Sequence, residues 1–232
     1  MIDIHSHILP GLDDGSPDDS VSLKMAALAV GDGIREIIAT PHVTETLSRE
    51  DIASSLADFQ ELLNDRKIPL KVHLGGEVPF DLLRKMDVPL TLAGSRYILV
   101  EFLPEWIPHD AEDVFRNFIL QGYRIIIAHP ERNRAFMQNT ELLKNLLMPG
   151  VHLQLTAMAL KGSFGPSVKF FAHALLRQGS VDFIASDAHD HRLRKPELSF
   201  LLTSGKNKKL YPALDQILHR NPEKLFKNGC EI

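Results

Sequence analysis

Seven short apolar segments recur along the 232-residue chain, and their alternation with longer amphipathic segments limits the fold more than any other feature. They cover residues 2–4, 36–39, 70–74, 97–100, 124–128, 151–155 and 181–185. Several are apolar almost throughout, as in YILVEF and RIIIAHP, which is typical of parallel strands buried on both faces. The pattern therefore predicts a parallel sheet.

Helical patterns fill the intervals between these segments. They cover residues 20–30, 51–64, 111–121, 141–147 and 168–178, and a last one begins near residue 221. Strands that alternate with helices in this way favour a single α/β domain, residues 1–232, closed into a barrel. Periodicity alone leaves an open doubly wound sheet as the alternative, although no glycine-rich dinucleotide or phosphate loop follows any expected strand.

Charge and cysteine content argue against several classes of protein. The net charge is −4, and the one short basic run, Lys206, Lys208 and Lys209, is expected to be a solvated loop, so a nucleic-acid partner is not indicated. The single cysteine, Cys230, allows no internal disulfide or thiolate metal cluster and fits a reducing compartment. Neither a membrane span nor a signal peptide is recognisable. We expect a cytoplasmic protein.

Polar side chains of ligand type concentrate where the expected strands end. In a parallel barrel these ends share one rim, where active sites form. His-x-His in the first strand directs both rings to one side, because side chains alternate with a period of two. Each residue alone has an ordinary structural explanation, but their coincidence predicts a metal site of the nitrogen and oxygen type that suits manganese, iron or zinc. The set is His5, His7, His42, Glu77, Glu101, His129, Asp187 and His189.

The sixth expected strand differs from the others, because it ends at Gln154 and Thr156. The other six histidines are separate from the set. Four fall inside expected strands or helices and are interpreted as structural: His73, His152, His173 and His219. The other two, His109 and His191, fall in loops.

Seven motifs occur in order along nearly the whole chain: DIHSH, DDG, TPH, GGE, VEF, AHPER and SDAH. On these motifs the chain resembles the polymerase and histidinol phosphatase (PHP) superfamily, and within it the bacterial CpsB/YwqE-like protein-tyrosine phosphatases that regulate capsule synthesis. The resemblance implies a distorted, TIM-like (β/α)7 barrel of the PHP type. It also implies three divalent metal ions at the carboxyl-terminal rim, with manganese expected first and iron or zinc as alternatives.

Carried over position by position, the resemblance assigns nine ligands to three metal sites, with Glu77 as a bridge between the first two. The sets are His5, His7, Glu77 and Asp187; Glu77, Glu101 and His129; and Asp14, His42 and His189. The neighbouring Asp13 leaves open which of the two aspartates is the ligand. Arg132 matches the family's substrate-binding arginine, and Arg134 and Arg194 are candidates for further positive charge at the rim.

The implied reaction is hydrolysis of a phosphomonoester, phosphotyrosine on a protein, by a metal-activated water. The implied partner is a bacterial tyrosine autokinase of polysaccharide export, and a homo-oligomer is left open. A phenolate leaving group, with a pKa near ~10, needs little protonation. His109 and His191 are therefore only weak candidates for a general acid. The implied catalytic residues are His5, Glu77, His129, Arg132 and Asp187.

Three other functions remain as alternatives. A small-molecule phosphatase of the histidinol-phosphate type would use the same metal site. A metal-dependent amidohydrolase also begins with His-x-His, but many such enzymes bridge their metals with a modified strand-end lysine, where this chain offers Glu77 and Glu101. A non-catalytic module would be expected to have lost ligands. The acidic net charge gives a nuclease role little support.

Overall fold

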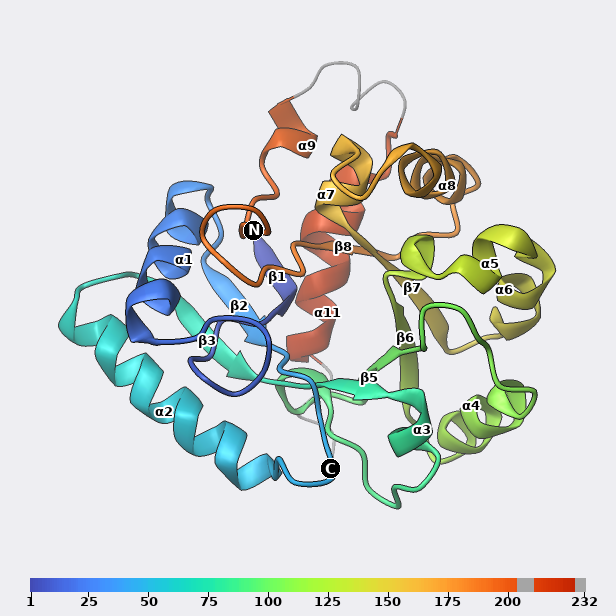
Figure 1. The fold of residues 1–232 in the computed structure, drawn as a ribbon, viewed down its shortest axis with the longest axis horizontal. Helices are drawn as coiled ribbons and strands as arrows, with labels where there is room; N and C mark the ends of the chain where they lie inside the picture. Colours follow the sequence, from blue (N-terminus) through green and yellow to red (C-terminus); the bar gives the residue numbers. More distant parts are fainter. Residues whose placement is uncertain (204–210, 228–232) are drawn as a thin grey trace.

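A computed structural model describes residues 1–203 and 211–227, so Lys206, Lys208, Lys209 and Cys230 lie outside the described part. All strand pairings within it are parallel, and they form two sheets with the orders β1-β2-β3 and β4-β5-β6-β7-β8 (Figure 1). The strands are β1 Ile2–Ser6, β2 Glu36–Ala39, β3 Lys71–Leu74, β4 Glu77–Pro79, β5 Tyr97–Glu101, β6 Arg124–Ala128, β7 Val151–Thr156 and β8 Phe183–Ala185. The predicted α/β class with parallel strands is confirmed.

The expected helices are present, with ends that differ by one or two residues. Helices α1 and α2 lie outside the first sheet, while α4, α5, α6 and α8 lie outside the second (Figure 1). No helix in the described ranges is both long and apolar enough to cross a membrane. The helices are α1 Asp19–Gly31, α2 Arg49–Asp65, α3 Phe80–Leu83, α4 Ala111–Leu120, α5 Arg134–Gln138, α6 Thr140–Leu146, α7 Ala157–Lys161, α8 Pro166–Arg177, α9 Phe200–Thr203 and α11 Asn221–Lys227, with short turns η1 Leu92–Gly94, η2 Pro130–Arg132 and η3 Gln216–Arg220.

The expected third strand, residues 70–74, is present as β3, but the expectation that Glu77 ends it is wrong, because the chain divides between β3 and β4 and Glu77 begins β4 in the other sheet. The division falls at two glycines. A Cβ atom on Gly75 would lie 2.6 Å from Cγ2 of Ile38, and one on Gly76 would lie 2.5 Å from Cδ2 of Leu90. Such contacts are too close for any side chain, so only glycine allows the chain to turn here. The turn delivers Glu77 to the edge of the second sheet.

Backbone hydrogen bonds link the two sheets at both edges. On one side the N–H of His7 donates to the carbonyl of Ala188, 2.8 Å away, just beyond β1 and β8. On the other side the N–H of Val43 donates to the carbonyl of Glu77, 2.9 Å away, just beyond β2. The carboxyl ends of the strands are therefore held close together. Closure of all strands into one seven-stranded barrel stays a prediction.

The apolar strands are buried on both faces, as their composition indicates. Alternate residues separate into two cores: Ile37 of β2 packs in the outer core against the helices, and Ile38 packs in an inner core. The inner core joins residues from strands of both sheets with Leu225 of α11, and its members are almost inaccessible to solvent. Two packed cores hold the strand ends rigidly, which is what a precisely built site requires.

Candidate active site

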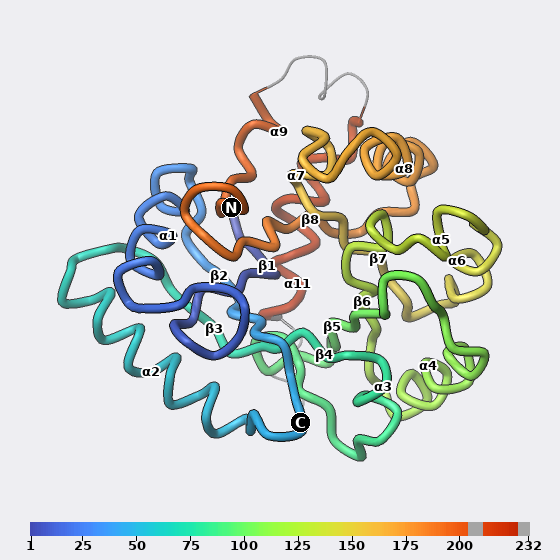
Figure 2. The backbone as a smooth tube through the Cα atoms, viewed as in Figure 1, coloured from blue at the N-terminus to red at the C-terminus, as the bar shows by residue number. Residues whose placement is uncertain are grey.

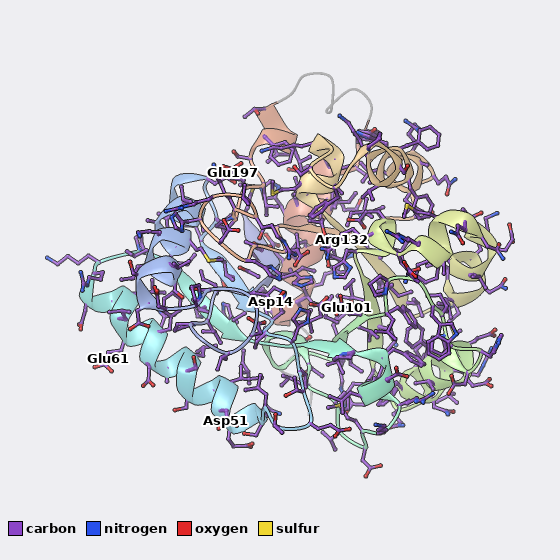
Figure 3. The ribbon with its side chains drawn as sticks, in the orientation of Figure 1. Asp14, Asp51, Glu61, Glu101, Arg132 and Glu197 are labelled. Atoms are coloured by element: carbon purple, nitrogen blue, oxygen red, sulfur yellow. The ribbon has the colours of Figure 1, made fainter. Side chains whose placement is uncertain are left out.

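Nine side chains of metal-ligand type gather at the carboxyl ends of the strands. Figure 3 places Asp14 and Glu101 near the centre of the molecule with Arg132, far from Asp51 and Glu61 on α2. In the described part of the chain, ligand atoms of the nine form four overlapping clusters, and within each cluster all atoms lie within 4.8 Å of one another. The three predicted ligand sets, here the first, second and third group, draw on these clusters without coinciding with them. The structure therefore brings together every residue of the predicted metal set: His5, His7, Asp14, His42, Glu77, Glu101, His129, Asp187 and His189.

The first group is fully buried. Nε2 of His5 lies 3.3 Å from Oε2 of Glu77 and 3.4 Å from Oδ1 of Asp187. Nε2 of His7 lies 3.4 Å and 3.5 Å from the same two oxygens, and the two ring nitrogens are 3.1 Å apart. Ligands at ~2.0–2.2 Å from a tetrahedral ion lie about 3.4 Å from one another, so these spacings match one shared cation.

Glu77 supplies an independent test of that fit. Its Oε2 atom is buried and accepts no hydrogen bond from any residue in the described part of the chain. An unsatisfied buried carboxylate oxygen is costly, and a bound cation would satisfy it. Nitrogen atoms of His5, His7 and His42 surround this oxygen at 3.2–3.4 Å. The donor set therefore fits a divalent metal ion at this position.

The other oxygen of Glu77 faces the second group. Its Oε1 atom lies 2.8 Å from Nε2 of His129, which in turn lies 3.6 Å from Oε1 of Glu101. One carboxylate thus contacts both groups, as a bridging ligand would. The backbone of His129 has a φ of 29°, and that of Asp187 has a φ of 50°. Left-handed backbone is strained for such residues, and strain of this kind is concentrated at functional sites.

The third group lies on the open side of the site. Oδ1 of Asp14 lies 3.4 Å from Nε2 of His42 and 3.5 Å from Nε2 of His189. The side chain of Asp14 is 68% exposed and that of His42 is 30% exposed. Solvent and a large substrate can therefore approach the site from this side.

The neighbouring carboxylate of Asp13 has a different position. Its Oδ2 atom lies 2.6 Å from Nδ1 of His7 and accepts a hydrogen bond from the N–H of His42. Its other oxygen accepts from the N–H of Gly15. Asp13 is thus fully engaged in orienting His7, and the geometry favours Asp14 as the ligand.

We expect Asp13→Asn to weaken metal binding by about 10- to 100-fold, because loss of a carboxylate behind a ligating histidine has effects of this size. Titration of metal-free protein with manganese would measure the change. Asp113→Asn, on the exposed first turn of α4, is the matched control. Equal affinities for the Asp13 and Asp113 variants would contradict the orienting role.

Two positively charged side chains reach the site. Arg132 and Arg194 both donate to Oδ2 of Asp187, the latter at 2.6 Å. The guanidinium of Arg132 also lies over the ring of Phe164, 5.0 Å from its centre. Arg134, by contrast, pairs with exposed Glu105, 2.5 Å away. Of the two additional candidates for positive charge, the structure brings Arg194 to the site and not Arg134.

Comparison with known proteins identifies the family. Residues 1–227 match the family described as "Capsular polysaccharide synthesis, CpsB/CapC". The chain belongs to this family. It is 39% identical to the tyrosine-protein phosphatase YwqE of Bacillus subtilis, over 98% of this chain and 92% of that protein. It is 30% identical to the tyrosine-protein phosphatase CpsB of Streptococcus pneumoniae, over 84% of this chain and 86% of that protein.

Solved structures agree with this assignment. The structure aligns with one from a crystallographic study of YwqE and CpsB as metal-dependent tyrosine phosphatases. The TM-score is 0.87 and the sequence identity is 35%, and the alignment covers 100% of this chain and 96% of that one. A dihydropyrimidinase from Brevibacillus agri aligns with a TM-score of 0.58 at 12% identity, over 97% of this chain and 70% of that one. That second likeness shows a shared fold alone.

Two residues at the site of this CpsB/CapC chain have a role that the sequence did not reveal. Oε1 of Gln154 lies 2.8 Å from Nδ1 of His5 and so fixes the orientation of that ring. Thr156 donates weakly to Asp187, at 3.5 Å. Both lie near the carboxyl end of β7, where the sequence offers no strong ligand type. Their spacing of two residues, which places them on one face of the strand, was the available signal.

The other histidines lie outside the cluster. His73 contacts Glu36, His152 contacts Asp182, and the two in helical segments, His173 and His219, contact Tyr211 and Asp215. These positions agree with the structural interpretation. His109 lies on an exposed turn before α4, and His191 accepts a hydrogen bond from Arg192. Neither loop histidine belongs to the group of ligand atoms.

Buried charges shift the pKa values of the cluster. Burial opposes the charged form of His7, but contacts with Asp13 and Glu77 outweigh burial and raise its pKa to about 10. Burial likewise opposes ionisation of Glu77, yet the charge of His5 and the hydrogen bond with His129 lower the pKa of Glu77 well below its usual value. Without metal, these shifts favour a proton on His7 and negative charge on Glu77.

These shifts predict how the stability of the metal-free protein depends on pH. The folded pKa of His7, about 10, exceeds its ordinary value of 6.5. Its stabilising contribution is therefore complete below pH 6.5 and is lost as the pH rises towards 10. We expect the free energy of unfolding to fall by about 3 kcal/mol between pH 6.5 and pH 9. Manganese-loaded protein should show a much smaller fall, because a metal replaces the proton.

Urea unfolding of both forms at several pH values would measure this difference. If the metal-free protein keeps or gains stability between pH 6.5 and pH 9, the positive charge assigned to His7 is contradicted.

Proposed function

We propose that this CpsB/CapC-family chain is a metal-dependent protein-tyrosine phosphatase. Its expected substrate is a phosphotyrosine-bearing protein, in the cell a bacterial tyrosine autokinase of capsule or exopolysaccharide synthesis. One observation carries the proposal: nine ligand-type side chains converge around Glu77, and two arginines meet at the adjacent Asp187. The names of YwqE and CpsB, tyrosine-protein phosphatases of the same family, support it.

Three divalent ions are proposed at the cluster, manganese first, with iron or zinc as alternatives. When bound, they would supply activation of the attacking water and offset negative charge on the phosphoryl oxygens. The family resemblance divides the nine clustered residues among them: His5, His7, Glu77 and Asp187 for the first, Glu77, Glu101 and His129 for the second, and Asp14, His42 and His189 for the third.

The remaining residues act by position and charge. Asp13 and Gln154 hold the outer nitrogens of His7 and His5, so that both Nε2 atoms face Glu77. Arg132 presents a planar set of donors suited to two phosphoryl oxygens, with Arg194 beside it. Asp187 holds both guanidinium groups through one oxygen before substrate arrives. A phenolate leaves with little need of a proton donor, because its pKa is only ~10.

The shape of the site favours a protein substrate over a small molecule. Two small cavities border it, of about 70 and 50 Å³. Pockets that enclose small ligands usually measure ~300–1,000 Å³. A shallow site with an exposed Asp14 and half-buried His42 suits a residue presented on a protein surface. Histidinol phosphate therefore remains the second candidate, with the same metal set. Cytoplasmic location and homo-oligomer formation stay predictions.

Phosphate release by the purified protein tests the proposal. The protein would be stripped of metal, reloaded with manganese, and given a tyrosine-phosphorylated peptide, histidinol phosphate or a cyclic amide. We expect manganese-dependent release from the peptide, and at most slow release from histidinol phosphate. Preference for histidinol phosphate would move the assignment to metabolism. Turnover of the amide alone would support an amidohydrolase, and inactivity on all three would support a non-catalytic module.

A further inference from the structure

Two small cavities lie side by side at the rim of the site and share Glu101 and Phe102 as part of their walls. The first, about 70 Å³, is also lined by His129 and Arg132. The second, about 50 Å³, is also lined by Leu103 and Trp106. A charged cavity thus lies next to one with an apolar wall.

The segment that carries Leu103 and Trp106, between β5 and α4, is held in place. The carbonyl of Leu103 accepts a hydrogen bond from Nδ2 of Asn133, at 2.8 Å, and the carbonyl of Pro104 accepts one from the N–H of Arg134, at 2.6 Å. Figure 2 shows this connection passing close to the start of α5. Its backbone is therefore fixed to the residues that directly follow Arg132.

The two apolar side chains on this fixed segment face solvent. Leu103 is 58% exposed and Trp106 is 47% exposed. Large apolar side chains displayed on a rigid rim are typical of contact surfaces, and tryptophan is especially common among residues that dominate binding. Both side chains line the cavity that borders Glu101, and Arg132 lines the adjoining cavity, so the substrate of this site is the natural occupant.

We propose that Leu103 and Trp106 form the surface against which the phenyl ring of phosphotyrosine packs, and that this contact selects aryl phosphates over alkyl phosphates. This inference rests on the proposed phosphatase function. An aryl phosphate joins a phosphoryl group to a flat apolar ring through a single oxygen. That arrangement matches a charged cavity adjoining an apolar one. An indole next to the ring adds an aromatic contact beyond simple burial of apolar surface.

The chain provides its own probe, because Trp106 is the only tryptophan among the 232 residues. Metal-loaded protein would be titrated with phenylphosphonate and with methylphosphonate, two non-hydrolysable phosphate analogues that differ in the ring. We expect the tryptophan fluorescence to change with phenylphosphonate and to stay nearly constant with methylphosphonate at saturation. Inhibition of peptide dephosphorylation would establish saturation for each compound.

Substitutions then separate contact with the ring from damage to the site. Trp106→Ala and Leu103→Ala should each raise the inhibition constant of phenylphosphonate by about 3- to 10-fold, the size expected for one aromatic or apolar contact. The constant for methylphosphonate should stay within about twofold, because its phosphoryl contacts are unchanged. Phe170→Ala on α8 and Leu120→Ala on α4 remove apolar side chains elsewhere that are even more exposed, 72% and 80%, and should change neither constant.

Each other outcome has a distinct meaning. Equal rises for both phosphonates, or no rise for either, would overturn the inference and leave the phosphatase function standing. The tryptophan fluorescence could instead change with protein concentration and not with phenylphosphonate. That result would overturn the inference and assign the surface of Leu103 and Trp106 to contact between two copies of the chain. If the wild-type protein releases no phosphate from any phosphomonoester, the proposed function is overturned. The fluorescence titration would still report whether the phenyl ring of phenylphosphonate binds.

Discussion

Glu77→Gln should lower kcat/KM on a phosphotyrosine peptide by about 1,000-fold or more, because one carboxylate contacts two of the proposed metal groups. Its Oε2 atom faces nitrogens of His5 and His7, and its Oε1 atom lies 2.8 Å from His129. The glutamine side chain has the same shape as glutamate but lacks the negative charge. Its NH2 group replaces one carboxylate oxygen and presents N–H donors where a metal ligand is required. Steady-state kinetics and metal content measured by mass spectrometry would report both losses.

Glu36→Gln is the matched control for this substitution. Glu36 is also a strand glutamate bonded to a histidine, His73, at 2.7 Å, but it lies outside the cluster. The control should keep wild-type activity and metal content. Circular dichroism should show that both variants fold. A Glu77→Gln protein with normal metal content and turnover would rule out the proposed bridging role.

Arg132→Met should lower kcat/KM by about 100-fold or more, with much of the loss in phosphate affinity. The guanidinium carries the planar donor set that suits two phosphoryl oxygens, and it lies over the ring of Phe164. Methionine is an unbranched side chain without the charge. Arg132→Lys should restore only part of the activity, because lysine offers a single charged point in place of a fork. The inhibition constant for inorganic phosphate would measure the binding component.

Arg134→Met provides the control two residues further along the chain. Its guanidinium pairs with Glu105 at the exposed surface, and surface pairs of this kind contribute little. We expect kinetics close to wild type. Arg194→Met should resemble the Arg132 variant in direction, since both side chains meet Asp187. Similar losses at Arg132 and Arg134 would show that overall positive charge matters, and not a specific phosphate contact.

The sequence determined the class of fold and nearly all of the candidate site. Apolar segments that alternate with amphipathic ones can only be buried as parallel strands covered by helices, and the carboxyl ends of such strands lie close together. Eight of the nine clustered residues could therefore be found from their positions at strand ends. Asp14 lies in a loop, and its place in the set came from resemblance to a family.

The finer choices could be made only once the folded arrangement was known. Asp13 and Asp14 are adjacent and chemically identical, and a loop has no periodicity to tell which carboxylate faces His42 and which holds His7. Arg134 and Arg194 are equally plausible in sequence, but only Arg194 reaches Asp187. These choices depend on contacts between residues far apart in the chain, and so does the place of Glu77 at the start of β4, beyond two glycines. Local sequence patterns do not encode such contacts.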